Sequence, residues 1–85
     1  MKKRSRNPAK PEPTAAQTLA ARRSDIARLL NVLAMELDNH DQRAKAQPAD
    51  WGFAGNLGKV RSDLIDIVGF LSGMEREEVE RFLAE

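Results

Sequence analysis

The 85-residue chain contains 14 Lys and Arg against 13 Asp and Glu, so its formal net charge is only +1. Hydrophobic residues make up 41% of the chain and charged residues 32%, a balance typical of one small soluble helical domain. Because the chain has no cysteine, a disulfide framework and a thiolate metal site are both excluded.

The first 13 residues differ in composition from the rest. They carry five basic residues against one acidic residue, a net charge of +4, whereas residues 14–85 carry nine against twelve, a net charge of −3. With three prolines and almost no apolar side chains, this segment buries too little surface to offset the entropy of ordering it. We predict a disordered basic arm over residues 1–13, followed by a single helical domain over residues 14–85. The basic residues of the arm are Lys2, Lys3, Arg4, Arg6 and Lys10.

The sequence carries no sign of a membrane span or an export signal. No apolar run approaches the roughly 18 residues that a membrane span needs. No apolar stretch follows the basic N-terminus, as it would in a signal peptide. We therefore expect a cytoplasmic protein that does not bind a membrane.

Apolar residues recur at steps of three and four between Leu19 and Leu37, the period of a helix with one buried face. Upstream of them, Thr14 precedes Gln17 by three positions, which is the spacing of an N-terminal capping box. We predict a helix over about residues 15–39.

A second apolar stripe with the same period runs through residues 57–71. It predicts a helix that begins within residues 48–51 and ends near residue 71. Ser72 and Glu75 then have the spacing of another capping box. A short third helix is expected over about residues 73–84.

These elements predict an all-α fold, an antiparallel two-helix hairpin with a short C-terminal helix. Pairing around the loop would join residues whose numbers sum to about 90, so Leu33 would face Leu57. One partner helix covers roughly a third of a helix surface, and both apolar faces are broader than that. A homodimer forming a helical bundle would cover the remainder, and a monomeric three-helix bundle is the alternative. The residues expected to self-associate are Leu19, Ile26, Leu29, Leu30, Leu33, Leu37, Leu64, Ile65 and Val68.

The segment from Trp51 to Gly58 combines two aromatic residues with three regularly spaced glycines. Three glycines within a helix cost roughly 3 kcal/mol relative to alanine, so a compensating role is expected. Close packing against another helix is the preferred interpretation, and a loop or a groove for a partner are the alternatives. The candidate groove consists of Trp51, Gly52, Phe53, Gly55 and Gly58.

Metal binding has weak support in the sequence. The single histidine, His40, follows Glu36 by four residues and precedes Asp41, and this spacing can hold a metal ion. The preferred interpretation is a histidine that interacts favourably with the C-terminus of the first helix. We therefore expect neither a metal nor another cofactor.

Catalysis also has weak support. Asp63 and Asp66 lie three residues apart on one predicted helix face, where two carboxylates can share acid–base work. With Lys59 and Arg61 close in sequence, a solvated charged face is the preferred interpretation. No enzyme class is indicated.

The sequence is therefore most consistent with a small non-enzymatic interaction module that self-associates and binds an unknown protein partner. The alternative is a nucleic-acid-associated accessory or regulatory protein whose basic arm contacts phosphates. That arm has no aromatic side chain to stack on bases.

Overall fold

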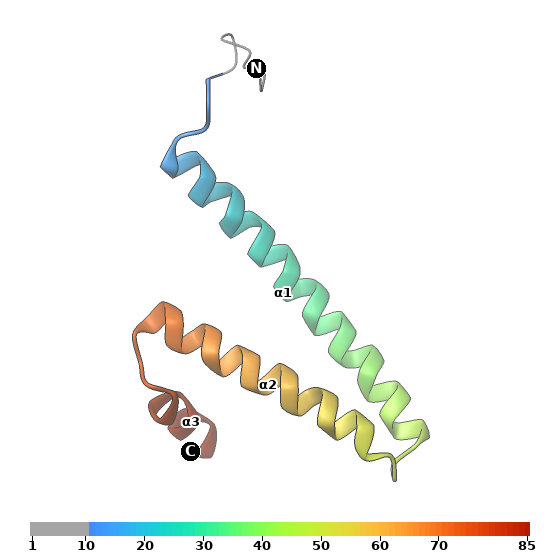
Figure 1. Ribbon diagram of the computed structural model, residues 1–85. Helices are drawn as coiled ribbons and strands as arrows, with labels where there is room; N and C mark the ends of the chain where they lie inside the picture. Colours follow the sequence, from blue (N-terminus) through green and yellow to red (C-terminus); the bar gives the residue numbers. More distant parts are fainter. Residues whose placement is uncertain (1–10) are drawn as a thin grey trace, which may run out of the picture. The chain divides into compact units, whose positions relative to one another are not determined.

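The computed structural model describes residues 11–85 and contains three helices within them (Figure 1). They are α1 (Ala15–Ala46), α2 (Trp51–Ser72) and α3 (Arg76–Ala84), and no strand occurs in this part of the chain, so the predicted all-α class is confirmed. Residues 1–10 of the predicted basic arm lie outside the described residues, and residues 11–14 have no regular secondary structure. The chain divides into two compact units between residues 39 and 40, and each is described by itself.

The first unit contains a single helical segment, the part of α1 up to Asn39. Its predicted capping box is confirmed. The Thr14 N–H donates to Gln17 Oε1 at 2.9 Å, and the Gln17 N–H donates to Thr14 Oγ1 at 3.0 Å. No residue of α1 is buried, and Leu29 is 63% exposed. A lone helix has nothing within its own unit on which to pack its apolar stripe.

The predicted end of α1 near Asn39 was wrong, because the helix continues for seven residues to Ala46. The added stretch is rich in good helix formers, and its Asp41 and Lys45 form an i,i+4 ion pair at 3.0 Å. Two basic residues in the last turn also complement the partial negative charge of the helix C-terminus. The connection to α2 therefore shrinks to residues 47–50.

The helix α2 begins at Trp51, within the predicted range. Asp50 is its N-cap, and its carboxylate accepts a hydrogen bond from the Gly52 N–H at 2.8 Å. The helix ends at Ser72, and its C-cap is Gly73, whose φ of +79° is the left-handed conformation that favours glycine. The Gly73 N–H donates to the Gly69 carbonyl at 2.9 Å.

The predicted capping box of Ser72 with Glu75 was wrong. Ser72 is the last residue of α2, where its hydroxyl donates to the Val68 carbonyl at 2.7 Å. Glu75 and Glu78 form the capping box instead, with the Glu75 N–H donating to Glu78 Oε1 at 2.9 Å. The helix α3 consequently begins at Arg76, three residues later than predicted.

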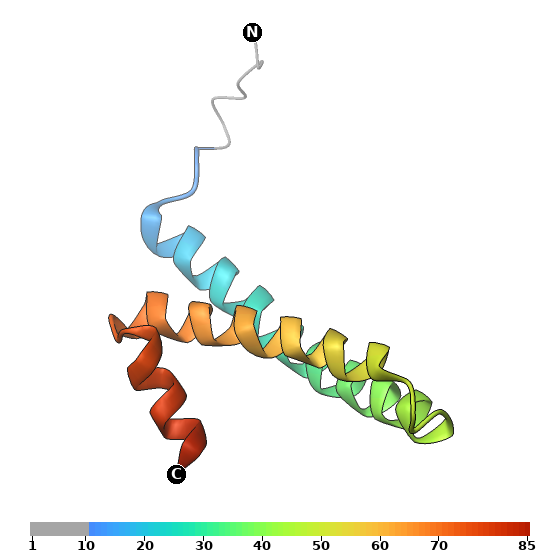
Figure 2. The ribbon, with the colours of Figure 1, turned by 60° about the horizontal axis from the view of Figure 1, so that its bottom comes forward.

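The helices α2 and α3 pack together within the second unit, and Figure 2 shows α3 turning sharply away from the end of α2. Ile65 and Val79, which are 3% and 6% exposed, are the buried apolar residues of this core. Arg76 ties the start of α3 to α2. Its Nη1 atom lies 2.7 Å from Asp66 Oδ1, and its Nη2 atom donates to Ser62 Oγ at 3.0 Å. These polar contacts orient α3 beside a very small apolar core.

The helix α2 has two different faces. Ser62, Ile65 and Gly69 lie on the face toward α3, and a Cβ atom on Gly69 would stand 3.1 Å from the Met74 carbonyl oxygen. At 3.6 residues per turn, the opposite face carries apolar residues at alternating steps of four and three, the heptad spacing of a coiled coil. We call this set the α2 seam; it consists of Phe53, Leu57, Val60, Leu64, Ile67 and Leu71.

None of the described helices combines the length and the hydropathy that a transmembrane helix needs.

Candidate functional site

Exposed apolar surface is the most distinctive chemical feature of residues 11–85. Fifteen large hydrophobic side chains in this part of the chain are exposed, whereas only Ile65 and Val79 are buried. Contiguous apolar surface on a small protein is typical of an interaction site. The exposed residues are Leu19, Ile26, Leu29, Leu30, Val32, Met35, Leu37, Trp51, Leu57, Ile67, Val68, Phe70, Leu71, Phe82 and Leu83.

On α1, a set of side chains recurs at the same alternating steps of four and three residues as in the α2 seam. We call this set the α1 seam; it consists of Ile26, Leu30, Leu33, Leu37, His40 and Ala44.

Most of the residues predicted to self-associate are exposed, but three differ. Leu33 and Leu64 are half-buried, and Ile65 is enclosed in the core between α2 and α3. Ile65 therefore stabilises the second unit itself. Of the other eight predicted residues, five belong to the two seams, whereas Leu19, Leu29 and Val68 do not.

Within the second unit, the end of α1 and the start of α2 meet in a pocket of about 260 Å³. Its lining includes His40 and Ala44 from α1, and Phe53 and Leu57 from α2. The His40 and Phe53 rings make an edge-to-face contact, with centroids 5.3 Å apart and planes at 80°. The turn therefore joins the neighbouring ends of the two seams.

His40 lines this pocket together with two carboxylate residues, Asp41 and Asp50. Its Nε2 atom is buried and has no hydrogen-bond partner among the described residues. No cluster of three His, Asp or Glu side chains that could hold a metal ion occurs within residues 11–85. His40 is also six residues short of the end of α1, so it is not at the helix C-terminus that the sequence predicted.

The segment Trp51–Gly58 is helical throughout, so the loop alternative was wrong. Trp51 is 85% exposed, while Phe53, two positions later and on another side of the helix, lines the turn pocket. A Cβ atom on Gly55 or Gly58 would meet no atom within 4 Å in the described part of the chain. Within one copy, these two glycines therefore face open space.

These glycine environments lead to a paired prediction. Gly55→Ala should raise the free energy of unfolding by about 1 kcal/mol, because alanine favours helix and nothing obstructs its methyl group. Gly69→Ala should lower it, because the new methyl group would press on the Met74 carbonyl. Urea unfolding followed by circular dichroism measures both. A destabilising Gly55→Ala change would instead show that this face is closely packed in solution.

The carboxylates considered for acid–base chemistry are engaged in exposed ion pairs. Asp63 lies 2.6 Å from the Lys59 Nζ atom, as expected for a solvated face, and this hydrogen bond raises the pKa of the ammonium group, with a further Coulombic contribution. Asp66 pairs instead with Arg76. Sequence reasoning missed Arg76 because its partner lies ten residues away on another helix.

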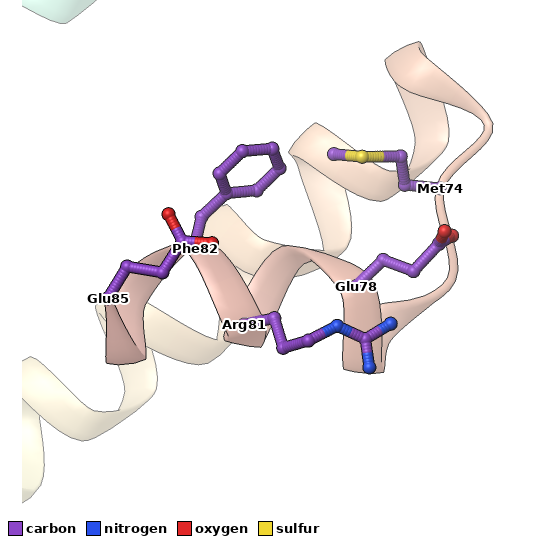
Figure 3. Close-up of a pocket in the computed structure, with 5 residues that line it drawn as sticks. All are labelled: Met74, Glu78, Arg81, Phe82 and Glu85. Atoms are coloured by element: carbon purple, nitrogen blue, oxygen red, sulfur yellow. The ribbon is translucent and has the colours of Figure 1, made fainter.

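A shallow slot of about 200 Å³ lies along α3, and sequence reasoning did not single it out. Figure 3 shows the Met74 and Phe82 side chains projecting on one side of α3, with Arg81 extending along the helix toward Glu78. Phe82 is 62% exposed and Met74 is half-buried. The α3 slot, completed by Glu85, therefore joins an apolar surface to charged groups.

The described surfaces are thus apolar stripes on α1 and α2 and, on α3, a slot that combines apolar and charged side chains. No protein-family model, curated protein or solved structure matched the chain in the three comparisons made.

Proposed function

We propose that this chain is a small, non-enzymatic helical interaction module that self-associates through its apolar helix faces and so presents a bundle to a protein partner. The observation that carries the proposal is the exposed apolar stripe of α1, which has no packing partner within its own unit. Exposed leucines on a helix are stabilised by packing on a second apolar helix.

An antiparallel hairpin of α1 and α2 is part of this proposal. Because α1 ends at Ala46 and α2 begins at Trp51, residues whose numbers sum to 97 would pair around the turn. Leu33 would face Leu64, and the other seam residues would follow in the same register. The turn pocket supports this register, since its residues 40, 44, 53 and 57 are those that the rule pairs. The earlier sum of about 90 followed from a helix end placed near residue 39.

A second copy is needed because the hairpin uses one face of each helix. Leu29, Val32 and Met35 lie outside the α1 seam, and all three are exposed. Two hairpins that pack together across a two-fold axis would cover such residues in a four-helix bundle. The proposed surface for the second copy therefore consists of exposed apolar residues outside the two seams.

The register can be tested with introduced cysteines, because the natural chain has none. The Leu33→Cys/Leu64→Cys variant should form an intramolecular disulfide under mild oxidation, since facing seam residues have the short Cβ separation that the bond requires. The Leu33→Cys/Leu57→Cys variant is the matched control for the other register. Preferential oxidation of the control pair, read on a non-reducing gel, would contradict the register of 97.

Self-association itself is tested by sedimentation equilibrium of the full chain. We expect a mass near twice the 9.5 kDa of one chain at micromolar concentration. A monomer throughout the accessible concentration range would contradict the proposal.

Nucleic-acid association is the second candidate. Arg22 and Arg23 lie on exposed helix beyond the basic arm, and neither forms an ion pair with a residue in the range 11–85. Together with the arm they give residues 1–24 a net charge of +6, from seven basic residues and one acidic residue. Such a segment would bind phosphates in a salt-dependent manner.

A further inference from the structure

The proposed hairpin leaves part of α1 without a partner, and this inference rests on the proposed self-association. The helix α1 has 32 residues and α2 has 22, so α1 is longer by ten. In the register of 97, residues 15–24 would extend about 15 Å past the end of α2, at a rise of 1.5 Å per residue. No seam residue of the same hairpin can cover this extension.

The extension carries an apolar anchor with positive charge beside it. Leu19 is 63% exposed, and Arg22 and Arg23 follow it at the spacings that place side chains on one helix face. Ile26, also exposed, continues the same apolar stripe into the seam. This segment therefore requires a surface that is apolar at its centre and acidic at its edge.

The α3 slot has that character. Met74 and Phe82 supply its apolar surface, and the charged groups that line it are two carboxylates, Glu78 and Glu85, and one guanidinium, Arg81, so its lining is net acidic (Figure 3). Residues 75–85 contain five acidic and two basic side chains, a net charge of −3. Unlike the face of α2 that packs on α3, this slot remains open in one copy of the chain.

The slot of the same copy is out of reach of the extension in the proposed hairpin. The α2 seam would hold α1 on one side of α2, whereas Ile65 and Gly69 mark the side occupied by α3. The axis of α1 and the helix α3 would therefore lie on opposite sides of the α2 axis, offset sideways by at least the thickness of a helix, roughly 10 Å with side chains. The complementary surface must therefore come from another molecule.

We propose that the N-terminal end of α1 in one copy docks into the α3 slot of a second copy. Leu19 packs against Phe82 and Met74, while Arg22 and Arg23 lie beside the acidic rim. A two-fold axis makes the contact twice, because each copy offers both an extension and a slot. The apolar anchor supplies the affinity, and the charge pairs orient the helix and make association salt-dependent.

A charge exchange tests this docking. Arg23→Glu and Glu85→Arg, each made alone in the full chain, should weaken dimerisation about tenfold. Each substitution replaces the attraction between residues 23 and 85 with a repulsion, and the dimer contains this contact twice. The combined variant should recover affinity to within about threefold of the natural chain, because the pair is restored with exchanged signs. Glu78 is left unchanged because it caps α3. Sedimentation equilibrium at low and high salt gives the dissociation constants.

Lys45→Glu is the matched control, since it makes the same charge change on an exposed position of α1 outside the extension, away from both the seam and the face of Val32 and Met35, and should leave the constant unaltered. Circular dichroism shows whether each variant keeps its helices. A dimer that neither single variant weakens overturns the docking but leaves self-association standing, whereas a natural chain that is monomeric overturns both. If Arg23→Glu reduces binding to a short DNA duplex without altering dimerisation, the extension serves nucleic acid and the docking is also overturned.

Discussion

Replacing Ile65 by alanine is expected to lower the free energy of unfolding by about 3 kcal/mol. Ile65 is 3% exposed and, with Val79, makes up the buried apolar core between α2 and α3. The lost methyl and methylene groups leave a cavity that so small a core cannot refill. Urea unfolding measures the loss, and hydrogen exchange should show it first in α3, whose attachment depends on this contact.

Phe70→Ala is the matched control on the same helix. Phe70 is 86% exposed, so its truncation should change the free energy of unfolding by less than about 0.5 kcal/mol. Equal effects of the two substitutions would show that burial within α2 and α3 does not determine the stability of this unit. Because Ile65 and Val79 share the core, their alanine variants should be non-additive.

Replacing Leu33 by aspartate is expected to disrupt the proposed hairpin of α1 and α2. Leu33 lies in the middle of the α1 seam, and a carboxylate buried opposite Leu64 would have no partner there. A cost above about 3 kcal/mol should separate the two helices. Single helices are marginally stable in water, so the circular dichroism signal at 222 nm should fall and the dimer should be lost.

Met35→Asp places the same charge two residues further along α1, on the side away from the seam. It should keep the helical signal, because Met35 is exposed and does not belong to the seam. It should nevertheless weaken the dimer, because the proposed bundle covers Met35 with the second copy. An unchanged helical signal in Leu33→Asp as well would contradict the hairpin.

The parts of the fold that depend on neighbouring residues could be predicted from the sequence. The three- and four-residue spacing of apolar side chains indicated α1 and α2, because helical periodicity is a local property. The capping box of Thr14 with Gln17 was also predicted correctly, since both partners lie within one turn. The start of α2 at Trp51 lies within the predicted range of residues 48–51.

Helix ends were less predictable where two local signals competed. Asn39 is acceptable both inside a helix and at its end, and the ion pair of Asp41 with Lys45 favours continuation. Two capping-box spacings likewise overlap near the start of α3, and the one that begins at Glu75 prevails because Ser72 is still helical. The seven added residues of α1 are what shift the proposed pairing register.

For the candidate surfaces, too, some features were determined by the sequence and others only by the tertiary structure. The amino-acid sequence alone determined that α1 and α2 carry apolar stripes, because a stripe is only a spacing. Tertiary structure alone decided that Ile65 belongs to a core with Val79, that Arg76 bonds to Asp66, and that Met74 and Phe82 share a slot. Each of these depends on how α3 folds back after Gly73, and contacts between separate helices are not encoded in the spacing of either one.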